Sequence, residues 1–538
     1  EESKLEFIKL ARNHIETTIQ ISRAIYKIRA DSSILNDLFQ LIEKHKALLL
    51  AEAIEDRSIK FDLGIPDSLL RKEKRLSRLI FEEQKRLLEE KSDAPFLKDS
   101  TAYYHTLFQL KEKLSKFRLS IASNYPKYYQ LKYDDTPLSI AVIQHNLSDE
   151  ELLIDYLFDA HGLSIFAIQK ERVFFHYQPI EKDKLNQQIS QFQALVHHPN
   201  TGLSEQVQTE QLKDYQQLAF QLYENLLAPV LQEFNAIQKL LIIPDGMLGY
   251  LPFELLLEEA TTIQNSFRSL PYLLKEYSIR YEYSARFLLP SKTDLDQPLS
   301  DLLAFAPNFE SNDAYSKLAF NALETTTIQE LIGGKALTGI DATAANFKSL
   351  AEQYGILHIA SHASVRDSAP NFSHLVFTPN KQEDHLLNAY ELYGLSLHAQ
   401  LAVLSACETG TGQLQTGEGI MSLSRAFKYA GCSSIITSLW KAEDQSTYQI
   451  MVQLYKMFKE GRDKDEALRQ AKLDFLAESK QQYTHPFYWG TFVLIGNEKA
   501  LIFKHSFQWE MLFLFMIALI AIGSIFLLGR RVKFKSNG

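Results

Sequence analysis

The sequence predicts an α/β fold in which a mostly parallel sheet is flanked by helices, preceded by an all-helical region and followed by one transmembrane helix. Three observations lead to this prediction. The first glycine is Gly64, and apolar residues before it recur at helical spacing. After about residue 136, short apolar runs alternate with amphipathic stretches. Near the C-terminus, a long apolar run carries no charge.

The composition is that of a folded protein with more than one unit. The chain has 538 residues, of which 46% are hydrophobic and 23% are charged, so we expect two or three units. The formal net charge of −9 is spread widely, and no long basic block indicates nucleic-acid binding. The two cysteines, Cys407 and Cys432, exclude a disulfide framework and a cysteine-rich zinc site. The chain opens at Glu1 without a methionine or a signal-like segment, which we interpret as a processed or truncated piece of a longer protein.

Residues 1–130 are predicted to be helical. Apolar residues recur three and four positions apart in this region, which places them on one face of a helix. They include Leu35, Leu38, Phe39 and Ile42 in one stretch and Leu76, Leu79 and Ile80 in another. Further helices are expected over 69–91 and 102–118. Paired amphipathic helices of this kind are typical of the end of a helical solenoid, although no 34-residue repeat with fixed residues is visible.

From about residue 136 to residue 500 the pattern changes to alternating strands and helices. The strand predictions rest on short apolar runs between turn signals. They cover 152–158, 163–168, 173–177, 239–246, 278–283, 302–306, 355–360, 401–405, 434–438 and 490–495, and the helix predictions cover 182–196, 206–234, 342–353, 418–430 and 444–459. Such alternation predicts a largely parallel sheet covered on both faces, with any ligand site at the carboxyl ends of the strands.

Two of the predicted strands end in a histidine and a cysteine. His362 follows the run Ile356-Leu-His-Ile-Ala-Ser, and Cys407 follows Leu401-Ala-Val-Leu-Ser-Ala and precedes Glu-Thr-Gly-Thr-Gly412. A thiol is only a few per cent thiolate at neutral pH, and a neighbouring imidazole raises that fraction. His362 precedes Cys407 by 45 positions, near the roughly 50 residues that separate the pair in caspases, although the caspase signature itself is absent. The pair indicates a cysteine protease.

Each of these two residues has a structural alternative. A cysteine at a strand end is usually a small buried hydrophobe, and a histidine near a strand is usually a core residue. The two together, with the glycine-rich loop that follows Cys407, favour catalysis over these alternatives. Cys432 has no second feature beside it and is expected to be structural.

Other classes of site find no support in the sequence. His358 and His362 are four positions apart, but they lie on a strand-like run without the glutamate of a zinc-protease helix, so no metal site is predicted. The chain has no G-x-S-x-G elbow of a serine hydrolase. The glycines after Cys407 do not fit the spacing of a phosphate-binding or dinucleotide-binding loop.

At the level of whole motifs the chain resembles the CHAT family, caspase-like peptidases that are related to separases and commonly fused to tetratricopeptide repeats. The resemblance covers roughly residues 140–500 and rests on five segments. These are 241–254 (LIIPDGMLGYLPFE), 357–362 (LHIASH), 404–410 (LSACETG), 417–427 (GEGIMSLSRAF) and 431–444 (GCSSIITSLWKAED). It implies a caspase-like sandwich over 136–500, with 136–235 as its N-terminal part. Residues 1–130 would be the end of a repeat array and its connector.

The resemblance also implies an active site. Its catalytic dyad is His362 and Cys407, in which His362 activates the thiol and later protonates the leaving amine. The backbone N–H groups of Cys407 and Ala363 would form the oxyanion hole. Asp444 aligns with an acidic position of separases and is predicted to belong to the P1 pocket, where it would favour a basic residue; the alternative is that Asp444 caps the helix that follows it. This chemistry requires no metal and no organic cofactor.

Residues 511–529 are predicted to form a single transmembrane helix. At 1.5 Å per residue the segment spans about 28 Å, close to the roughly 30 Å of a hydrocarbon core. Trp509 stands at its entry, and residues 530–538 form a basic tail that the positive-inside rule places in the cytoplasm. The catalytic domain would then be extracytoplasmic. The alternatives are a tail-anchored protein with a cytosolic body and a buried hydrophobic helix.

These observations together predict a membrane-anchored, caspase-like cysteine endopeptidase that cleaves protein substrates. A regulatory protein partner is expected on the upstream repeats, because repeat arrays offer broad binding surfaces. Two other functions stay open at this point. One is a non-catalytic scaffold that uses the same fold and the repeats for protein–protein interaction. The other is a signalling subunit in which the predicted span transmits a state.

Overall fold

The computed structural model describes most of the chain. The described residues are 2–29, 32–51, 54, 68, 69, 72, 75, 76, 79, 80, 83, 100–125, 138–159, 161–199, 204–260, 266–289, 301–309, 315–379, 385–406, 409–415, 418–503 and 516. The chain forms two compact units, one of Glu1–Lys46 with Ser139–Gly538 and the other of Ala47–Leu138. Residues 1–130 are predicted from the sequence to form one helical region, whereas Glu1–Lys46 groups with the sheet.

The smaller unit contains α5 (Ser100–Asn124), which extends the helix expected over 102–118. Leu114, Phe117 and Ile121 are buried, and their spacing places them on one face of α5. The ammonium group of Lys72 lies 5.1 Å from the ring of Phe117. The helix predicted over 69–91 falls mostly outside the described residues, and the structure does not confirm the predicted repeats.

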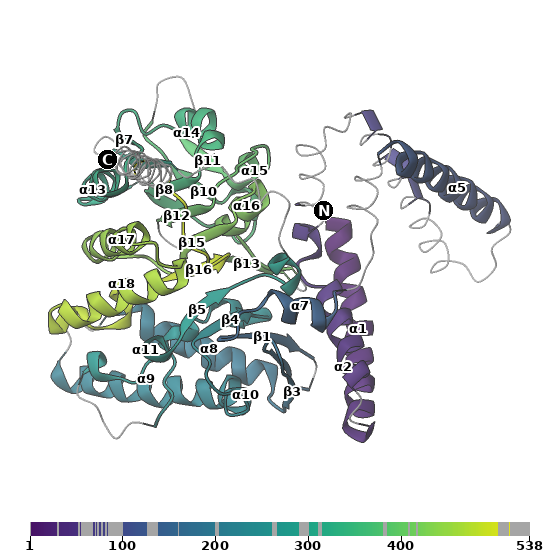
Figure 1. The fold of residues 1–538 in the computed structure, drawn as a ribbon, viewed down its shortest axis with the longest axis horizontal. Coiled ribbons are helices and arrows are strands. Elements are labelled where there is room, and N and C mark those ends of the chain that lie inside the picture. The colour runs from purple at the N-terminus through teal and green to yellow at the C-terminus, as the bar shows by residue number, and fades with distance from the viewer. Residues whose placement is uncertain are drawn as a thin grey trace, which may run out of the picture. The chain divides into compact units, whose positions relative to one another are not determined.

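An eleven-stranded sheet lies at the centre of the larger unit (Figure 1). The strands follow the order β3-β2-β1-β4-β5-β16-β15-β12-β8-β6-β7. They are β1 (Glu151–Phe158), β2 (Leu163–Ile168), β3 (Val173–Gln178), β4 (Lys239–Ile243), β5 (Ser278–Tyr281), β6 (Leu302–Pro307), β7 (Lys335–Gly339), β8 (Ile356–Ala360), β12 (Leu401–Ser405), β15 (Ser434–Ser438) and β16 (Phe492–Gly496). Neighbouring strands of this sheet run parallel except in β3-β2-β1 and between β15 and β16. The mostly parallel sheet expected from the sequence is confirmed.

Alternate residues of the central strands face two separate layers of helices. In β12, Leu401 and Val403 belong to one core, and Ala402 and Leu404 belong to the other. A strand buried on both faces needs apolar residues throughout, which is why β12 is a continuous apolar run. The first layer is α8 (Lys182–His197), α9 (Glu205–Leu226), α13 (Asn321–Ile332), α17 (Asp444–Lys459) and α18 (Lys464–Glu478), and the second is α14 (Ala344–Leu350), α15 (Ala389–Leu392) and α16 (Leu423–Ala430). Figure 1 shows α17 and α18 on one side of β12 and β15, with α15 and α16 on the other.

Short elements complete the larger unit. They are the helices α7 (Ile140–Asn146), α10 (Ala228–Leu231) and α11 (Leu273–Glu276), a sheet of β9 (His362–Ser364), β10 (His374–Val376) and β11 (Leu386–Asn388), and a hairpin of β13 (Gly412–Gln415) and β14 (Gly419–Ser422). The helix predicted over 418–430 therefore begins as the strand β14 and becomes helical only at Leu423. The hydroxyl of Ser422 caps α16 by accepting the N–H of Arg425.

The N-terminal helices α1 (Glu2–Arg29) and α2 (Ser32–Lys44) pack on the hairpin strands of the sheet. The ring of Phe39 lies 5.6 Å from that of Phe166 in β2. Just past the end of α2, the ammonium group of Lys46 contacts the carboxylate of Asp155 in β1, and both side chains are buried. Burial raises the pKa of Asp155, and the charge of Lys46 opposes that shift. This buried ion pair connects the segment just after α2 to β1 of the sheet.

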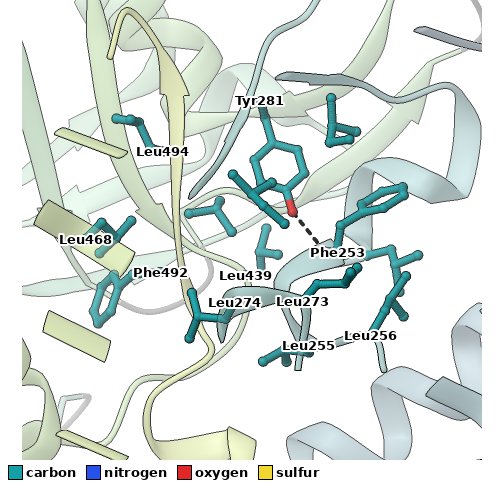
Figure 2. Packing of buried hydrophobic residues seen from close by; sticks show 14 of the residues in the cluster. Phe253, Leu255, Leu256, Leu273, Leu274, Tyr281, Leu439, Leu468, Phe492 and Leu494 are labelled. Carbon is teal, nitrogen blue, oxygen red and sulfur yellow. Dashed lines mark hydrogen bonds between the residues drawn. The ribbon is translucent and has the colours of Figure 1, made fainter. Parts of the chain in front are cut away.

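Phe253 of segment 241–254 packs into the first core beside Leu255 and Leu256 (Figure 2). The N–H of Phe253 donates to the hydroxyl of Tyr281 over 2.8 Å, and that hydroxyl donates to the carboxylate of Glu254. Glu254 also forms an ion pair of 3.2 Å with Lys472 of α18, where both side chains are buried. Burial lowers the pKa of Lys472. The motif therefore joins β5 to α18.

The prediction of a single-pass membrane protein is wrong by this structure. A membrane span needs about 20 consecutive apolar residues in one helix. No helix within the described parts of the chain meets that requirement. The longest of them, α1, carries charged residues along its length. The assignment of an extracytoplasmic catalytic domain on a membrane anchor is corrected accordingly. The predicted span over 511–529 lies outside the described residues except for Met516.

Candidate active site

β8 and β12 run parallel as neighbours, so both predicted catalytic segments leave the sheet at the same edge. Ala360, the last residue of β8, lies opposite Ser405, the last residue of β12. The N–H of Ser361 then donates to the carbonyl oxygen of Ser405 over 3.2 Å. His362 is the next residue and begins β9. The structure thus places His362 beside the end of β12, and Cys407 is the second residue after that end.

Three neighbours hold the ring of His362. The ring lies 4.6 Å from that of Phe309 and stacks on that of Tyr315 at 5.5 Å. Its Nε2 atom lies 2.7 Å from the carbonyl oxygen of Ser316. Because a carbonyl oxygen only accepts hydrogen bonds, this contact assigns a proton to Nε2. In the neutral ring, Nδ1 is then the nitrogen that can take up a proton, as a general base must.

Cys407 and Glu408 lie outside the described residues, but both of their neighbours are described. On one side, the hydroxyl of Ser438 donates to the carbonyl oxygen of Ala406. On the other side, the N–H of Thr409 donates to the same hydroxyl over 3.4 Å. Ser438 is the last residue of β15, the strand beside β12. One side chain therefore contacts the chain both before and after the predicted nucleophile.

Thr409 makes further hydrogen bonds to two elements. Its hydroxyl lies 2.8 Å from that of Thr437 and accepts the N–H of Ser438 over 3.3 Å. Its carbonyl oxygen accepts the N–H of Ser424, at the start of α16, over 3.1 Å. Thr409, Thr437, Ser438 and Ser424 have no exposed surface. Buried polar groups are normally paired, and these pair with one another.

The glycines after Thr409 allow the chain to pack closely on itself. A Cβ atom at Gly412 would lie 2.2 Å from the carbonyl oxygen of Met421 in β14, and one at Gly410 would lie 3.1 Å from the carbonyl oxygen of Ser438. The hydroxyl of Tyr250 donates to the carbonyl oxygen of Gly412 over 2.5 Å. A glycine-rich loop can serve a ligand that approaches its backbone closely. The structure shows approach by the chain's own backbone.

Asp444 begins α17 but does not cap it. The capping side chain is Glu443, which accepts the N–H groups of Gln445 and Ser446 over 3.2 and 2.8 Å. The alternative reading of Asp444 as the helix cap is therefore wrong. Asp444 instead accepts the N–H of Phe320 over 2.9 Å. It is half-buried, and this burial raises the pKa of its carboxyl group.

Residues 315–320 link Asp444 to His362. This segment offers the carbonyl oxygen of Ser316 to His362 and the N–H of Phe320 to Asp444. Ala363, the second predicted oxyanion residue, lies in the middle of β9, opposite Leu375 of β10. His362, Ala363 and Asp444 are thus grouped at one edge of the sheet, while the roles assigned to them stay predictions.

His358, which precedes His362 by four positions, has a packing role. Its ring lies 2.8 Å from the carboxylate of Glu324 and 3.2 Å from the hydroxyl of Tyr455. All three side chains are buried. His358 therefore joins β8 to α13 and α17.

Comparison with known proteins assigns a family to the chain. The CHAT domain matches residues 216–497, more than half of the 538 residues. The chain belongs to the CHAT domain family. Tetratricopeptide repeat protein 28 of Mus musculus is 26% identical over 216 residues, a match that covers 33% of this chain and 8% of that protein. The CHAT chain thus spans a small fraction of this relative.

Two solved structures are weakly similar to this CHAT chain. One is Saccharomyces cerevisiae separase in a separase–securin complex, with 10% identity and a TM-score of 0.45 over 74% of this chain and 34% of that chain. The other is the Arg-specific cysteine proteinase gingipain R, with 11% identity and a TM-score of 0.31 over 60% of this chain and 76% of that chain.

Several residues of the candidate site were not anticipated from the sequence. Thr437 and Ser438 end an apolar strand, and two adjacent hydroxyls in such a position are a signal that polar partners lie nearby. Ser316 carries no comparable signal, because its backbone carbonyl rather than its side chain contacts His362. A backbone contact between residues far apart in the chain becomes visible only in the folded structure.

Proposed function

We propose that this CHAT domain is a cysteine endopeptidase in which Cys407 is the nucleophile and His362 the general base. The observation that supports the proposal is the parallel pairing of β8 with β12, because it brings the chain just before His362 against Ser405, the last residue of β12. The hydrogen bond from Nε2 to Ser316 supports it, since it leaves Nδ1 to accept a proton. Membership of the CHAT family supports it further.

The proposed reaction is acyl transfer to sulfur. His362 takes the proton of the Cys407 thiol, and the thiolate attacks the scissile carbonyl carbon. Backbone N–H groups stabilise the resulting oxyanion, for which Cys407 and Ala363 are the proposed donors. The C–N bond then breaks, and the imidazolium gives its proton to the leaving amine. Water, deprotonated by the same imidazole, hydrolyses the thioester and restores the thiol. These steps use no metal and no organic cofactor.

We propose Asp444 as the acidic residue of the P1 pocket. The carboxylate stands at the start of α17 and contacts the same segment, residues 315–320, that contacts His362. A carboxylate at this place favours substrates with arginine or lysine at P1, because it pairs with their charge.

Cleavage of peptides with Arg or Leu at P1 tests both assignments. The parent is expected to prefer Arg, Cys407→Ala to lose all cleavage, and Asp444→Asn to cleave with an Arg preference reduced about tenfold or more. Because burial raises the pKa of Asp444, the preference should also weaken on acidification, starting above the pH at which an exposed aspartate is protonated. Cleavage that survives in Cys407→Ala contradicts the nucleophile. An unchanged Arg preference in Asp444→Asn contradicts the pocket residue alone.

We further propose that a protein partner on the upstream helical region regulates the site. The relative named as a tetratricopeptide repeat protein supports a partner-binding role for that region. Contacts at the end of α2 support it as well. The carboxylate of Glu43 accepts the hydroxyl of Ser284 and the N–H of Ala285 over 2.6 and 2.7 Å, and the guanidinium of Arg286 donates to the carbonyl oxygen of Glu43 over 2.9 Å.

The segment that contacts Glu43 also contacts α16. The carboxylate of Glu282 pairs with Lys428 over 2.8 Å, and the hydroxyl of Tyr283 lies 3.2 Å from that of Ser424. The N–H of Ser424 in turn donates to Thr409. Hydrogen bonds and the backbone of residues 282–286 therefore connect α2 with Thr409, the residue that follows Cys407 and Glu408. Such a connection is a physical route by which a change in the position of α2 reaches the site.

Replacement of Glu43 by Gln tests this route. We expect Glu43→Gln to change kcat/KM for peptide cleavage about tenfold, a typical size for coupling between sites. Asn36→Ala is the matched control, because Asn36 lies on the same helix but accepts the N–H of Ile140. If the two variants have equal kcat/KM values at equal thermal stability, the route through residues 282–286 is contradicted.

A further inference from the structure

We infer that Ser438 and Thr409 are positioning residues for the proposed nucleophile, because they hold together the two ends of the segment that carries it. The inference rests on the proposed function. It extends the site to two side chains that take no part in any chemical step.

The central observation is that one hydroxyl group makes two hydrogen bonds. Ser438 donates its hydroxyl hydrogen to the carbonyl oxygen of Ala406 and accepts the N–H of Thr409 on the same oxygen. A serine hydroxyl has one donor and two acceptor lone pairs, so it can serve both partners at once. Three residues can extend about 10 Å. Two hydrogen bonds to one oxygen keep Ala406 and Thr409 much closer than that.

Ser438 lies on a central strand of the sheet, paired on both sides. Ser438 ends β15, which lies inside the sheet between β12 and β16 and pairs with Phe492 of β16. The N–H of the next residue, Leu439, donates to the carbonyl oxygen of Thr491 over 2.9 Å. Ser438 has no exposed surface, so water does not compete for its hydroxyl. A reactive group must be held to within about 0.5 Å, and strands supply that precision better than loops.

Thr409 completes the arrangement from the other side. Its hydroxyl accepts the N–H of Ser438 over 3.3 Å and contacts the hydroxyl of Thr437 over 2.8 Å. The N–H of Gly410 donates to the carbonyl oxygen of Ser438 over 2.9 Å. The contacts between Ser438 and Thr409 thus run in both directions, and removal of either hydroxyl weakens them.

The chain packs closely around Gly410 at the end of β15. A Cβ atom at Gly410 would lie 3.0 Å from the Cγ2 of Thr437 and 3.2 Å from the Cδ2 of Leu439, which shows how closely this end of β15 is packed. Alanine fits at 438 but has no hydroxyl. Serine supplies the hydroxyl without an added methyl group.

Ser434 provides a matched control on the same strand. It is also fully buried and donates its hydroxyl to a backbone carbonyl, that of Gln400, over 2.8 Å. It lies at the opposite end of β15. If Ser438 only stabilises the fold, Ser438→Ala and Ser434→Ala should behave alike.

The experiment compares Ser438→Ala, Ser434→Ala, Thr409→Val and Thr409→Ser in the full chain. Valine has nearly the shape of threonine without its hydroxyl, so this variant carries the test even if Ser438→Ala folds poorly. Three quantities are measured: amide hydrogen exchange over residues 405–411, inactivation by a peptidyl acyloxymethyl ketone, and alkylation of Cys407 by iodoacetamide. The ketone needs the geometry of acyl transfer, whereas iodoacetamide needs only a thiolate.

We expect Ser438→Ala and Thr409→Val to slow inactivation by the ketone about 100-fold, as a misplacement of about 1 Å does. Alkylation by iodoacetamide should change no more than about threefold, because the imidazole partner is intact. Amide exchange at Thr409 and Gly410 should rise at least about tenfold, because the amide of Thr409 loses its acceptor in Ser438→Ala and the segment opens more often. Thr409→Ser keeps the hydroxyl and should therefore give parental values. Ser434→Ala should leave all three quantities near those of the parent.

Equal ketone inactivation in Ser438→Ala and Ser434→Ala overturns the inference while the proposed function stands. If Ser438→Ala and Thr409→Val slow inactivation by the ketone and alkylation by iodoacetamide equally, the inference is also overturned. The loss would then be one of thiol reactivity and not of position. Unchanged amide exchange in both Ser438→Ala and Thr409→Val overturns it independently of any activity. A parent protein whose Cys407 the ketone does not label contradicts the proposed function, and the inference falls with it.

Discussion

Replacement of His362 by alanine is expected to lower kcat/KM for peptide cleavage about 1,000-fold while the protein stays folded. A positioned acid–base group contributes about 10²–10⁴-fold to such reactions. In the proposed mechanism the imidazole acts twice, first on the thiol and then on the leaving amine. The side chain is only partly buried, at the start of a three-residue strand, so its removal leaves the main cores untouched.

A second histidine provides the control for this prediction. His358→Gln removes a buried ring that contacts Glu324 and Tyr455, and it should lower thermal stability. Its kcat/KM per folded molecule should change less than about tenfold. Added imidazole should partly restore cleavage by His362→Ala, because a small base can enter the space that the side chain leaves. If His362→Ala retains more than about a tenth of the parental kcat/KM, His362 is not the general base.

The second large effect concerns stability. Replacement of Lys472 by alanine is expected to lower the free energy of unfolding by about 3–5 kcal/mol, because it leaves the carboxylate of Glu254 buried without its cation. Glu254 would keep only the hydroxyl of Tyr281 among the partners described above. The measurement is chemical denaturation followed by tryptophan fluorescence.

The double variant Lys472→Met with Glu254→Gln separates the buried charge from the packing. It removes both charges, and glutamine can still accept the hydroxyl of Tyr281. We expect it to recover more than half of the stability that Lys472→Ala loses, because replacing a whole buried pair costs less than removing one partner. A loss below about 1 kcal/mol in Lys472→Ala would show that the ion pair does not stabilise this part of the core.

Long buried elements of this chain could be predicted from the sequence because their signal is local. β8 is apolar apart from His358, β12 is apolar up to its last residue, Ser405, and the structure buries every residue of both. The helix predicted over 444–459 coincides with α17. Parallel strands in a covered sheet need apolar residues on both faces, so short apolar runs bounded by turn signals favour strands of this kind.

Short and exposed elements escaped prediction. β7 is an edge strand with the sequence Lys-Ala-Leu-Thr-Gly, and none of its residues is buried, so it lacks an apolar run. β9 has three residues, too few for any periodicity. The helix predicted over 206–234 divides into α9 and α10, with Pro229 near the start of α10. Proline suits the first turn of a helix and interrupts a longer one.

The same difference between local and long-range signals applies to the candidate site. His362 was identified from the sequence because an imidazole and a thiol at the ends of two apolar runs indicate one chemistry. The contacts that hold the site, from Ser316, Ser438 and Glu43, join segments that lie far apart in the chain. Such contacts depend on the order of strands and on helix packing, which local patterns do not contain. The membrane prediction was wrong because apolar composition alone does not establish a spanning helix.

The most direct measurement is covalent labelling of the full chain by a peptidyl acyloxymethyl ketone with Arg at P1, with the modified residue located by peptide mass spectrometry. The proposed function predicts one adduct on Cys407, formed faster than with the Leu analogue and absent from His362→Ala on the same time scale. The buried thiol of Cys432 serves as the internal control and should stay unmodified. An intact, folded protein that forms no adduct at Cys407, or forms it equally fast in His362→Ala, would contradict a cysteine peptidase built on this pair.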